Sequence, residues 1–263
     1  MSTPFIIDAH LHLGLPGVLF TPEAELPDLL ARMDRLSICQ ALCTDQESLA
    51  GAVAKGLAKM RAAFEQSAGR LHYLAVFDPR QPRECLAALD RAVGWPGLAG
   101  VKIHPVWHRV PAEDPRYRPA WRWAAEHDLP LLSHTWSESD YNPLQRLSTP
   151  ERFEGFVQEF PQVRFVMGHA GGRGEGRRQA LRLARQYPQV YLDFAGDIFC
   201  NRLIETLTES VPVEKILFGS DFPWLDPRAN LSRVLLAPID LAVKMKILRN
   251  NAMAVYRLGT ERA

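Results

Sequence analysis

The chain has 263 residues, of which 47% are hydrophobic and 23% are charged, and its formal net charge is +1. These values are typical of a globular protein with a sizeable core, and they exclude the strongly basic surface of a nucleic-acid-binding protein. No apolar run approaches the roughly 20 residues of a membrane span, and the short apolar segment near the N-terminus lacks the basic residues of a signal peptide. We therefore expect a cytoplasmic protein whose partner is neither a nucleic acid nor a membrane.

Eight apolar runs with the character of buried strands follow one another from end to end. In chain order they are Phe5–His10, Ile38–Cys43, Leu71–Phe77, Leu98–His104, Leu129–His134, Val163–His169, Val190–Phe194 and Ile216–Asp221.

Helix-favouring segments separate these runs. They are Glu25–Leu36, Gln46–Gln66, Arg83–Val93, Pro119–Glu126, Pro150–Phe160, Glu175–Tyr187, Asn201–Val211, Asn230–Leu236 and Ile239–Leu258. This alternation predicts a single α/β domain, a (β/α)8 TIM barrel over residues 1–263. The alternative is a doubly wound open sheet, but the glycine fingerprint of its dinucleotide-binding form is missing after the first run.

The first run ends in His10-Leu11-His12. Residues two apart on a strand point to the same face, so we expect both imidazoles to project together at the carboxyl end of this strand. Two neutral imidazoles on one rigid element form half of a metal site. The pattern also fits two separately hydrogen-bonded core histidines, and the pair alone does not decide between these alternatives.

Further polar side chains stand at the carboxyl ends of other predicted strands. Asp221 closes the eighth run, and Lys102 lies two residues before His104 and shares its face. Active sites of TIM barrels lie at the carboxyl ends of the strands. The clustering therefore predicts one functional site, formed by His10, His12, Lys102, His104, His134, His169 and Asp221.

Five short motifs fall at these strand ends. They are Asp8-Ala9-His10-Leu11-His12, Gly100-Val101-Lys102-Ile103-His104-Pro105, Ser133-His134, Gly168-His169-Ala170-Gly171-Gly172 and Phe218-Gly219-Ser220-Asp221-Phe222-Pro223. Together they resemble the amidohydrolase superfamily of metal-dependent barrels, in the branch that contains aminocarboxymuconate semialdehyde decarboxylase and pyrone-dicarboxylate lactonase. The resemblance extends over essentially the whole chain.

The resemblance implies a role for each matching residue. His10, His12, His134 and Asp221 would bind one divalent metal, Asp221 would also accept a proton, and His169 would act beside the metal as an acid–base or orienting group. Imidazole and carboxylate ligands favour Zn²⁺ and are compatible with Mn²⁺ or Fe²⁺. In two-metal relatives a lysine placed like Lys102 is carbamylated and bridges two ions. We favour one ion, with Lys102 as a cation in the pocket.

Large side chains follow several strand ends and point to the kind of substrate. Aromatic residues such as Trp107 and Trp224 would form walls, and Arg109 would add positive charge. Such a pocket suits a small carboxylated ring, lactone or acyl compound, because arginine pairs with carboxylates. His104 alternatively makes hydrogen bonds only within the mouth of the barrel. The side chains that we expect to contact the substrate are Lys102, His104, Trp136 and Arg173.

These features lead to three hypotheses of function. The leading one is hydrolysis of an ester, lactone or amide bond by a metal-activated water. The alternative is non-oxidative decarboxylation of a small aromatic or unsaturated acid at the same metal site. The third is a binding barrel without catalytic activity. Relatives of the branch are often dimers, so the resemblance also allows a homodimer.

Overall fold

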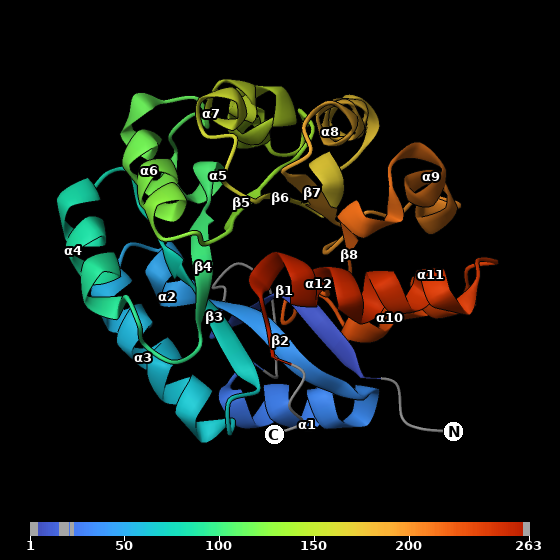
Figure 1. Cartoon of the computed structure of the whole chain (residues 1–263), viewed down its shortest axis with the longest axis horizontal. Helices are drawn as coiled ribbons and strands as arrows, with labels where there is room; N and C mark the ends of the chain where they lie inside the picture. Colours follow the sequence, from blue (N-terminus) through green and yellow to red (C-terminus); the bar gives the residue numbers. More distant parts are fainter. Residues whose placement is uncertain (1–4, 16–20, 22–23, 260–263) are drawn as a thin grey trace.

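The computed structural model of the chain describes residues 5–15, 21 and 24–259. Eight parallel strands stand in sequence order in one sheet, which curves into a nearly closed barrel with the helices on its outer side (Figure 1). This confirms the predicted TIM barrel. The strands are β1 (Ile6–Leu13), β2 (Ile38–Asp45), β3 (Leu71–Val76), β4 (Leu98–Ile103), β5 (Leu131–His134), β6 (Phe165–Gly168), β7 (Val190–Asp193) and β8 (Ile216–Leu217).

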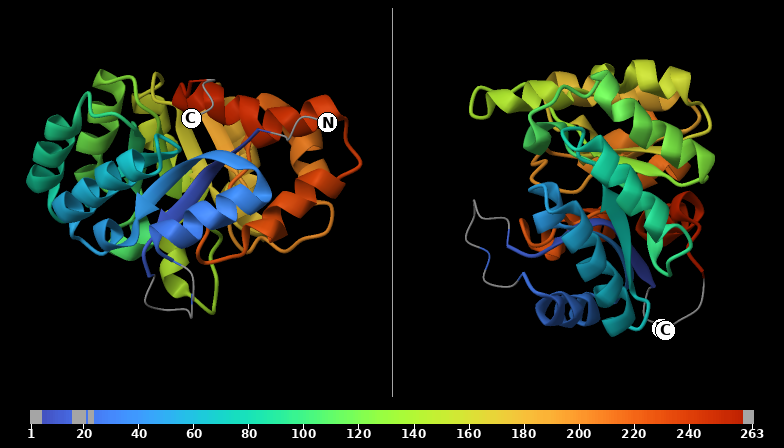
Figure 2. Two further views of the ribbon diagram at one scale, coloured as in Figure 1. Left: turned by 90° about the horizontal axis from the view of Figure 1, so that it is seen from below. Right: turned by 90° about the vertical axis from the view of Figure 1, so that its left-hand side faces the viewer.

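Backbone hydrogen bonds bring the last strand against the first. The Ala9 N–H donates to the Phe218 carbonyl at 2.8 Å, and the Asp221 N–H donates to the His10 carbonyl at 2.8 Å. The segment after β8 therefore runs beside β1, and the two ends of the sheet meet (Figure 2). This contact places Asp221 next to the His-x-His pair.

Helices and short helical turns connect the strands. The longer helices are α1 (Leu26–Leu36), α3 (Val53–Gln66), α4 (Pro82–Ala92), α6 (Arg118–Glu126), α7 (Glu154–Glu159), α8 (Gly174–Gln186), α9 (Leu203–Ser210) and α10 (Pro227–Leu236). The short ones are α2 (Gln46–Leu49), α5 (Pro105–His108), η1 (Pro115–Tyr117), η2 (Pro143–Ser148), η3 (Pro150–Phe153), η4 (His169–Gly171) and η5 (Val213–Lys215). No helix in the described part of the chain combines the length and apolarity that crossing a membrane requires.

Two predicted helices are interrupted. The segment predicted as one helix over Gln46–Gln66 breaks between α2 and α3, where Gly51 has a φ of 112°, a conformation that L-residues rarely adopt. The last predicted helix, Ile239–Leu258, is divided into α11 (Leu241–Met245), the π-helical η6 (Lys246–Asn250) and α12 (Asn251–Tyr256). Helical periodicity in the sequence continues across both breaks and does not show them.

An apolar layer fills the barrel toward the amino ends of the strands. The α12 side chains Ala252 and Val255 pack into it. The strand residues of this layer are Ile7, Ala9, Leu42, Leu74, Ala99, Leu132, Val166 and Leu217. A larger apolar cluster lies between the strands and the surrounding helices.

The pairing of β1 with β2 contains a β-bulge. Asp8 pairs with Ala41 and Leu11 pairs with Cys43, so two residues of β1 stand opposite the single residue Leu42. A bulge shifts the alternation of side chains between the two faces of a strand by one position. Simple alternation from Ile6 would place His10 and His12 on the outer face of the barrel. After the bulge they point to the inner face instead.

Candidate metal centre

The bulge turns both histidines of the His-x-His pair into the barrel. Before it, Ile7 and Ala9 belong to the inner apolar layer, whereas after it Leu11 and Leu13 belong to the outer cluster. His10 and His12, which alternate with those two leucines, lie toward the inside, with their ring centroids 5.3 Å apart.

Asp8 holds this irregular backbone in place. Its Oδ1 accepts hydrogen bonds from the His10 N–H at 3.1 Å and from the Ser220 N–H at 3.0 Å. Burial raises the pKa of Asp8 to about 7. One carboxyl group thus links the bulge of β1 to the residue before Asp221.

Three side chains converge at the end of β1. Asp221 Oδ1 lies 3.2 Å from His12 Nε2 and 3.9 Å from His10 Nε2. One donor atom from each of these three residues lies within 4.8 Å of the other two. Asp221 reaches this position in a backbone conformation with a φ of 66°, which is rare for a residue other than glycine and is typical of functional sites.

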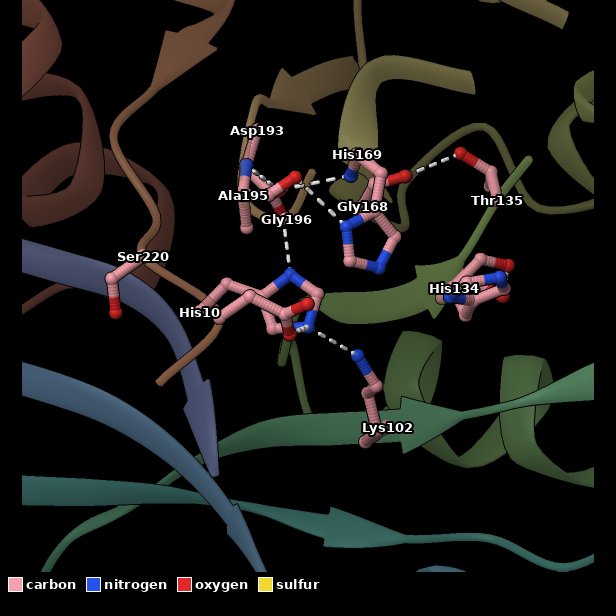
Figure 3. Close-up of polar contacts among 12 residues, drawn as sticks. His10, Lys102, His134, Thr135, Gly168, His169, Asp193, Ala195, Gly196 and Ser220 are labelled. Atoms are coloured by element: carbon pink, nitrogen blue, oxygen red, sulfur yellow. Dashed lines mark hydrogen bonds and ion pairs between the residues drawn. The ribbon is translucent and has the colours of Figure 1, made fainter. Parts of the chain in front are cut away.

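His10 is fixed between the carboxylate of Asp193 and the amine of Lys102 (Figure 3). Its Nδ1 lies 3.0 Å from Asp193 Oδ2, and Lys102 Nζ donates to its Nε2 at 2.8 Å. Since a carboxylate only accepts, the ring proton is on Nδ1, and the Nε2 lone pair accepts from Lys102, a hydrogen bond that a metal ion held at Nε2 would replace. A carboxylate on the outer nitrogen is the arrangement that orients metal-binding histidines.

The pKa shifts of these buried groups favour neutral imidazoles beside ionised acids. Burial lowers the pKa of His10 to about 4, assisted by the charge of Lys102, and it lowers the pKa of Lys102 to about 8. Burial by itself would raise the pKa of Asp221, but the hydrogen bond from His12 and the neighbouring imidazoles hold it below its usual range. Neutral nitrogen and anionic oxygen donors are the ligands that a divalent cation prefers.

His169 follows β6 and joins the same group of side chains. Its Nδ1 lies 2.9 Å from the Ala195 carbonyl, and its backbone N–H donates to Asp193 Oδ1 at 3.0 Å. A carbonyl only accepts, so Nδ1 carries the proton and Nε2 remains for the cavity. His169 also adopts a positive φ of 62°.

His134 and His104 form a second cluster at the ends of β5 and β4. Their rings are stacked, with centroids 4.3 Å apart and an interplanar angle of 10°. His134 Nε2 lies 2.8 Å from Gln145 Oε1, and His104 Nδ1 accepts from the Trp107 N–H at 3.3 Å. Burial lowers the pKa of both histidines. Among the described residues, the donor group of His10, His12 and Asp221 does not include His134, so its role as the fourth ligand stays a prediction.

A cavity of about 650 Å³ opens over these residues. The site histidines His10, His12, His104, His134 and His169 line it, together with Asp221 and the aromatic rings of Trp107, Trp136, Tyr141 and Trp224. Arg109, at the end of α5, adds a guanidinium to the lining. The size and the mixture of aromatic and polar walls are those of a small-molecule site.

Two residues that the sequence predicts as substrate contacts lie elsewhere. Lys102 is fully buried beneath His10, and within the described ranges it is not part of the cavity lining. Arg173 pairs with Asp197 at 3.1 Å and lies over the Trp136 ring, at the edge of a neighbouring cavity of about 380 Å³. Contact of either residue with a substrate stays a prediction.

Sequence reasoning missed Asp193 and Gln145. Asp193 ends β7, is fully buried, and contacts both His10 and His169. A carboxylate at the end of an apolar run was a signal for it, of the same kind as Asp221. Gln145 belongs to the short helical turn η2, and nothing in the sequence connects it with His134.

The donor set fits a divalent metal. It offers neutral imidazole and carboxylate donors, and His12 Nδ1 is buried with no hydrogen-bond partner within the described ranges. Moving the ring proton from Nε2 to Nδ1 gives up only the hydrogen bond to Asp221, and His12 Nε2 and Asp221 Oδ1 then both offer lone pairs to a cation.

The sequence also matches a family model described as Amidohydrolase, over residues 7–258. The chain belongs to this family. It is therefore an enzyme of the metal-dependent amidohydrolase superfamily, as the motifs at its strand ends predict. No curated protein sequence matches the chain.

Solved structures share the fold at low sequence identity. A 2,6-dihydroxybenzoate decarboxylase from Rhizobium is 14% identical, with a TM-score of 0.77 over 97% of this chain and 99% of its own. A 5-carboxyvanillate decarboxylase from Novosphingobium aromaticivorans, complexed with manganese and 4-hydroxy-3-methoxy-5-nitrobenzoic acid, is 12% identical, with a TM-score of 0.77 over 97% and 96%. An uncharacterised TIM-barrel protein from Bordetella bronchiseptica is 18% identical, with a TM-score of 0.76 over 95% and 97%.

Proposed function

We propose that the chain is a metal-dependent decarboxylase that releases CO₂ from a small aromatic carboxylic acid. The observation that carries this proposal is the position of the His10, His12 and Asp221 donor set in a cavity walled by indole rings. Flat aromatic walls suit a planar ring, and the donor set suits a cation that attracts its carboxylate. The solved decarboxylases of the same fold support this reaction. The sequence favoured hydrolysis and gave decarboxylation as the alternative, whereas this proposal favours decarboxylation.

The cofactor in this proposal is one divalent ion. His10, His12 and Asp221 would hold it, with His134 as the fourth ligand. When bound, the ion supplies Lewis-acid polarisation of the substrate oxygens. Mn²⁺ is as suitable as the Zn²⁺ that the sequence favoured, because the 5-carboxyvanillate decarboxylase complex contains manganese.

The reaction needs a proton at the ring carbon. The bond between the ring and the carboxylate breaks, its electron pair stays on the ring carbon, and a proton from an acid replaces the departing CO₂. We assign this proton to Nε2 of His169, because its Nδ1–H is fixed on the Ala195 carbonyl and its ring lines the cavity. His169 gives up its Nε2 proton in this step and is left neutral, with Nδ1–H still on the Ala195 carbonyl. Asp221 is the candidate proton acceptor that takes a proton from solvent and returns it to Nε2.

The remaining lining residues orient the substrate. The guanidinium of Arg109 has no ion-pair partner in the described part of the chain, so it is free to bind an anionic group. The Nε2–H of His104 is a hydrogen-bond donor in the neutral ring, since Nδ1 accepts from Trp107. Trp136 supplies a wall, and Arg173 would act on the substrate through its contact with that ring.

Hydrolysis is the second candidate function. The family to which the chain belongs is described as Amidohydrolase, and Asp221 is an ionised acid that can take a proton from water. The substrate would then be a small ester, lactone or amide.

An isotope experiment separates the two reactions. Protein loaded with Mn²⁺ or Zn²⁺ is incubated with aromatic acids, including 2,6-dihydroxybenzoate, in deuterated water. We expect CO₂ release with one deuterium on the vacated ring carbon, and loss of both in His169→Asn. Uptake of ¹⁸O from labelled water into the product of a lactone or ester, without CO₂ release from any acid, would instead establish hydrolysis.

A further inference from the structure

Gln46 lines the cavity with a polar side chain that no other group in the described part of the chain hydrogen-bonds. It lines the cavity, is only 4% exposed, and neither its Nε2 nor its Oε1 has a hydrogen-bond partner among the described residues. We infer that Gln46 determines substrate specificity by hydrogen bonding to a hydroxyl group on the aromatic ring of the substrate. This inference rests on the proposed function, because it concerns the substrate of the same site.

The backbone holds Gln46 in place without help from its side chain. Gln46 is the first residue of α2, directly after β2 ends at Asp45. The Asp45 carboxylate caps α2 by accepting from the Ser48 N–H at 2.8 Å, and it also lies 3.1 Å from Lys59 Nζ. The carbonyl of Gln46 accepts from the Ala50 N–H at 3.1 Å. Gln46 is therefore held at the cavity wall by the backbone, and its amide makes no contribution to that placement.

An unsatisfied buried amide is unusual. More than about nine in ten buried polar groups in folded proteins have a hydrogen-bond partner, because leaving one unpaired costs free energy. Here both atoms of one amide lack a partner among the described residues; they belong to a residue that lines the cavity but are themselves buried beneath its wall, and rotation of the side chain brings them to a ligand. Such local departures from good packing are expected where function requires them. A ligand that pairs with both atoms removes the cost.

The chemistry of the amide selects the kind of group it binds. Gln46 offers N–H donors at Nε2 and an acceptor at Oε1. A carboxylate only accepts and an ammonium only donates, so each would leave one atom unsatisfied, whereas a hydroxyl both donates and accepts. Anionic groups have other partners in this cavity, namely the proposed metal ion, which the donor set would hold, and Arg109. The group left for Gln46 is a neutral hydroxyl on the ring.

Ligand binding tests this assignment without requiring turnover. The dissociation constants of benzoate and of 2-, 3- and 4-hydroxybenzoate are measured by titration calorimetry on Mn²⁺-loaded protein. We expect the wild type to bind at least one hydroxybenzoate more tightly than benzoate, by about two- to tenfold for each hydrogen bond. In Gln46→Met this preference should disappear while the affinity for benzoate stays the same.

Gln40→Met is the matched control. Gln40 lies on β2, is 8% exposed, has an unpartnered Oε1, and is absent from the described lining of the cavity. This variant should keep the preference for the hydroxybenzoate. Gln46→Met should also melt at an equal or higher temperature than the wild type, because it removes an unsatisfied amide.

Several outcomes would overturn the assignment. These are a preserved preference in Gln46→Met, an equal weakening of all four acids in that variant, no preference in the wild type, and no binding of any acid. A lower melting temperature with equal weakening would identify Gln46 as a structural residue. The binding preference is measured without turnover. A failure to release CO₂ would therefore overturn the proposed reaction, whereas only the binding measurements decide the role of Gln46.

Discussion

The inner side chains of the barrel form two layers that belong to the same strands. Toward the amino ends the layer is apolar, and Leu132 of β5 is one of its fully buried members. Two residues further along β5, His134 belongs to the polar layer at the carboxyl ends, where His12 Nδ1 and both polar atoms of Gln46 lack partners among the described residues. The apolar layer is held together by packing, whereas the polar layer keeps polar atoms available to a ligand. We therefore expect stability to reside mainly in the first layer and chemistry in the second.

The largest expected effect tests the polar layer. Asp221→Asn removes the anionic donor of the proposed metal site, and with it several kcal/mol of transition-state stabilisation, so kcat/KM should fall by about 10³. CO₂ release and metal content by mass spectrometry measure the change. Asp197→Asn is the control, because Asp197 lines the same cavity but pairs with Arg173. Unchanged activity and metal content in Asp221→Asn would remove this residue from the site.

The second prediction tests the apolar layer on the same strand. Leu132→Ala leaves a cavity in the barrel interior and should lower the free energy of unfolding by about 2–5 kcal/mol. Urea denaturation of the metal-free protein measures this loss, and the folded variant should still bind one metal. His134→Asn should instead weaken metal binding and change the free energy of unfolding only slightly. If both variants lost stability to the same extent, the division between the two layers would be wrong.

Much of the barrel and of its apolar layer could be predicted from the sequence. Alternating apolar runs and helical segments are local signals, and they predict eight strands in a barrel, as observed. The same signals place polar residues such as His134 and His169 at strand ends, where the structure also has them. The breaks at Gly51 and at η6 were not predicted, because the helical periodicity continues through them.

The polar layer was harder to predict because its contacts are long-range. The apolar alternation of Ile7 and Ala9 would place His10 on the outer face, and only the bulge, which appears as a register shift, turns it inward. Asp193 contacts His10 across 183 residues of sequence, and Lys102 does so across 92. No local pattern contains these pairings.

The bulge that joins the two layers gives the third prediction. Asp8→Ala leaves the N–H groups of His10 and Ser220 without their acceptor, at a cost of about 1–3 kcal/mol for each buried group left unpaired. Because the bulge also aims His10 and His12, metal affinity should fall by about 10- to 100-fold, as for other residues that orient ligands. Chelator competition and urea denaturation measure the two effects. Asp8→Asn keeps an acceptor at Oδ1 and should retain most of both properties, and equal losses in the two variants would show that Oδ1 is not the acting group.

The prediction with the smallest expected effect concerns the pH dependence of stability. It tests whether only the polar layer makes the fold less stable in acid. His72 lies on β3, outside the site, with its ring centroid 5.5 Å from that of Phe64. Its Nε2 has no hydrogen-bond partner among the residues that the structure describes. Burial lowers the pKa of His72 from 6.5 to about 4, so between these pH values the unfolded chain binds a proton that the folded chain does not.

This contribution of His72 to stability is complete above pH 6.5 and is lost as the pH falls toward 4. The loss should reach about 1 kcal/mol at pH 5, with allowance for the partial exposure of the ring. His72→Phe should therefore flatten the fall in unfolding free energy between pH 6.5 and 5, measured by urea denaturation at each pH. An unchanged slope would assign the acid sensitivity of the fold to the buried histidines of the polar layer.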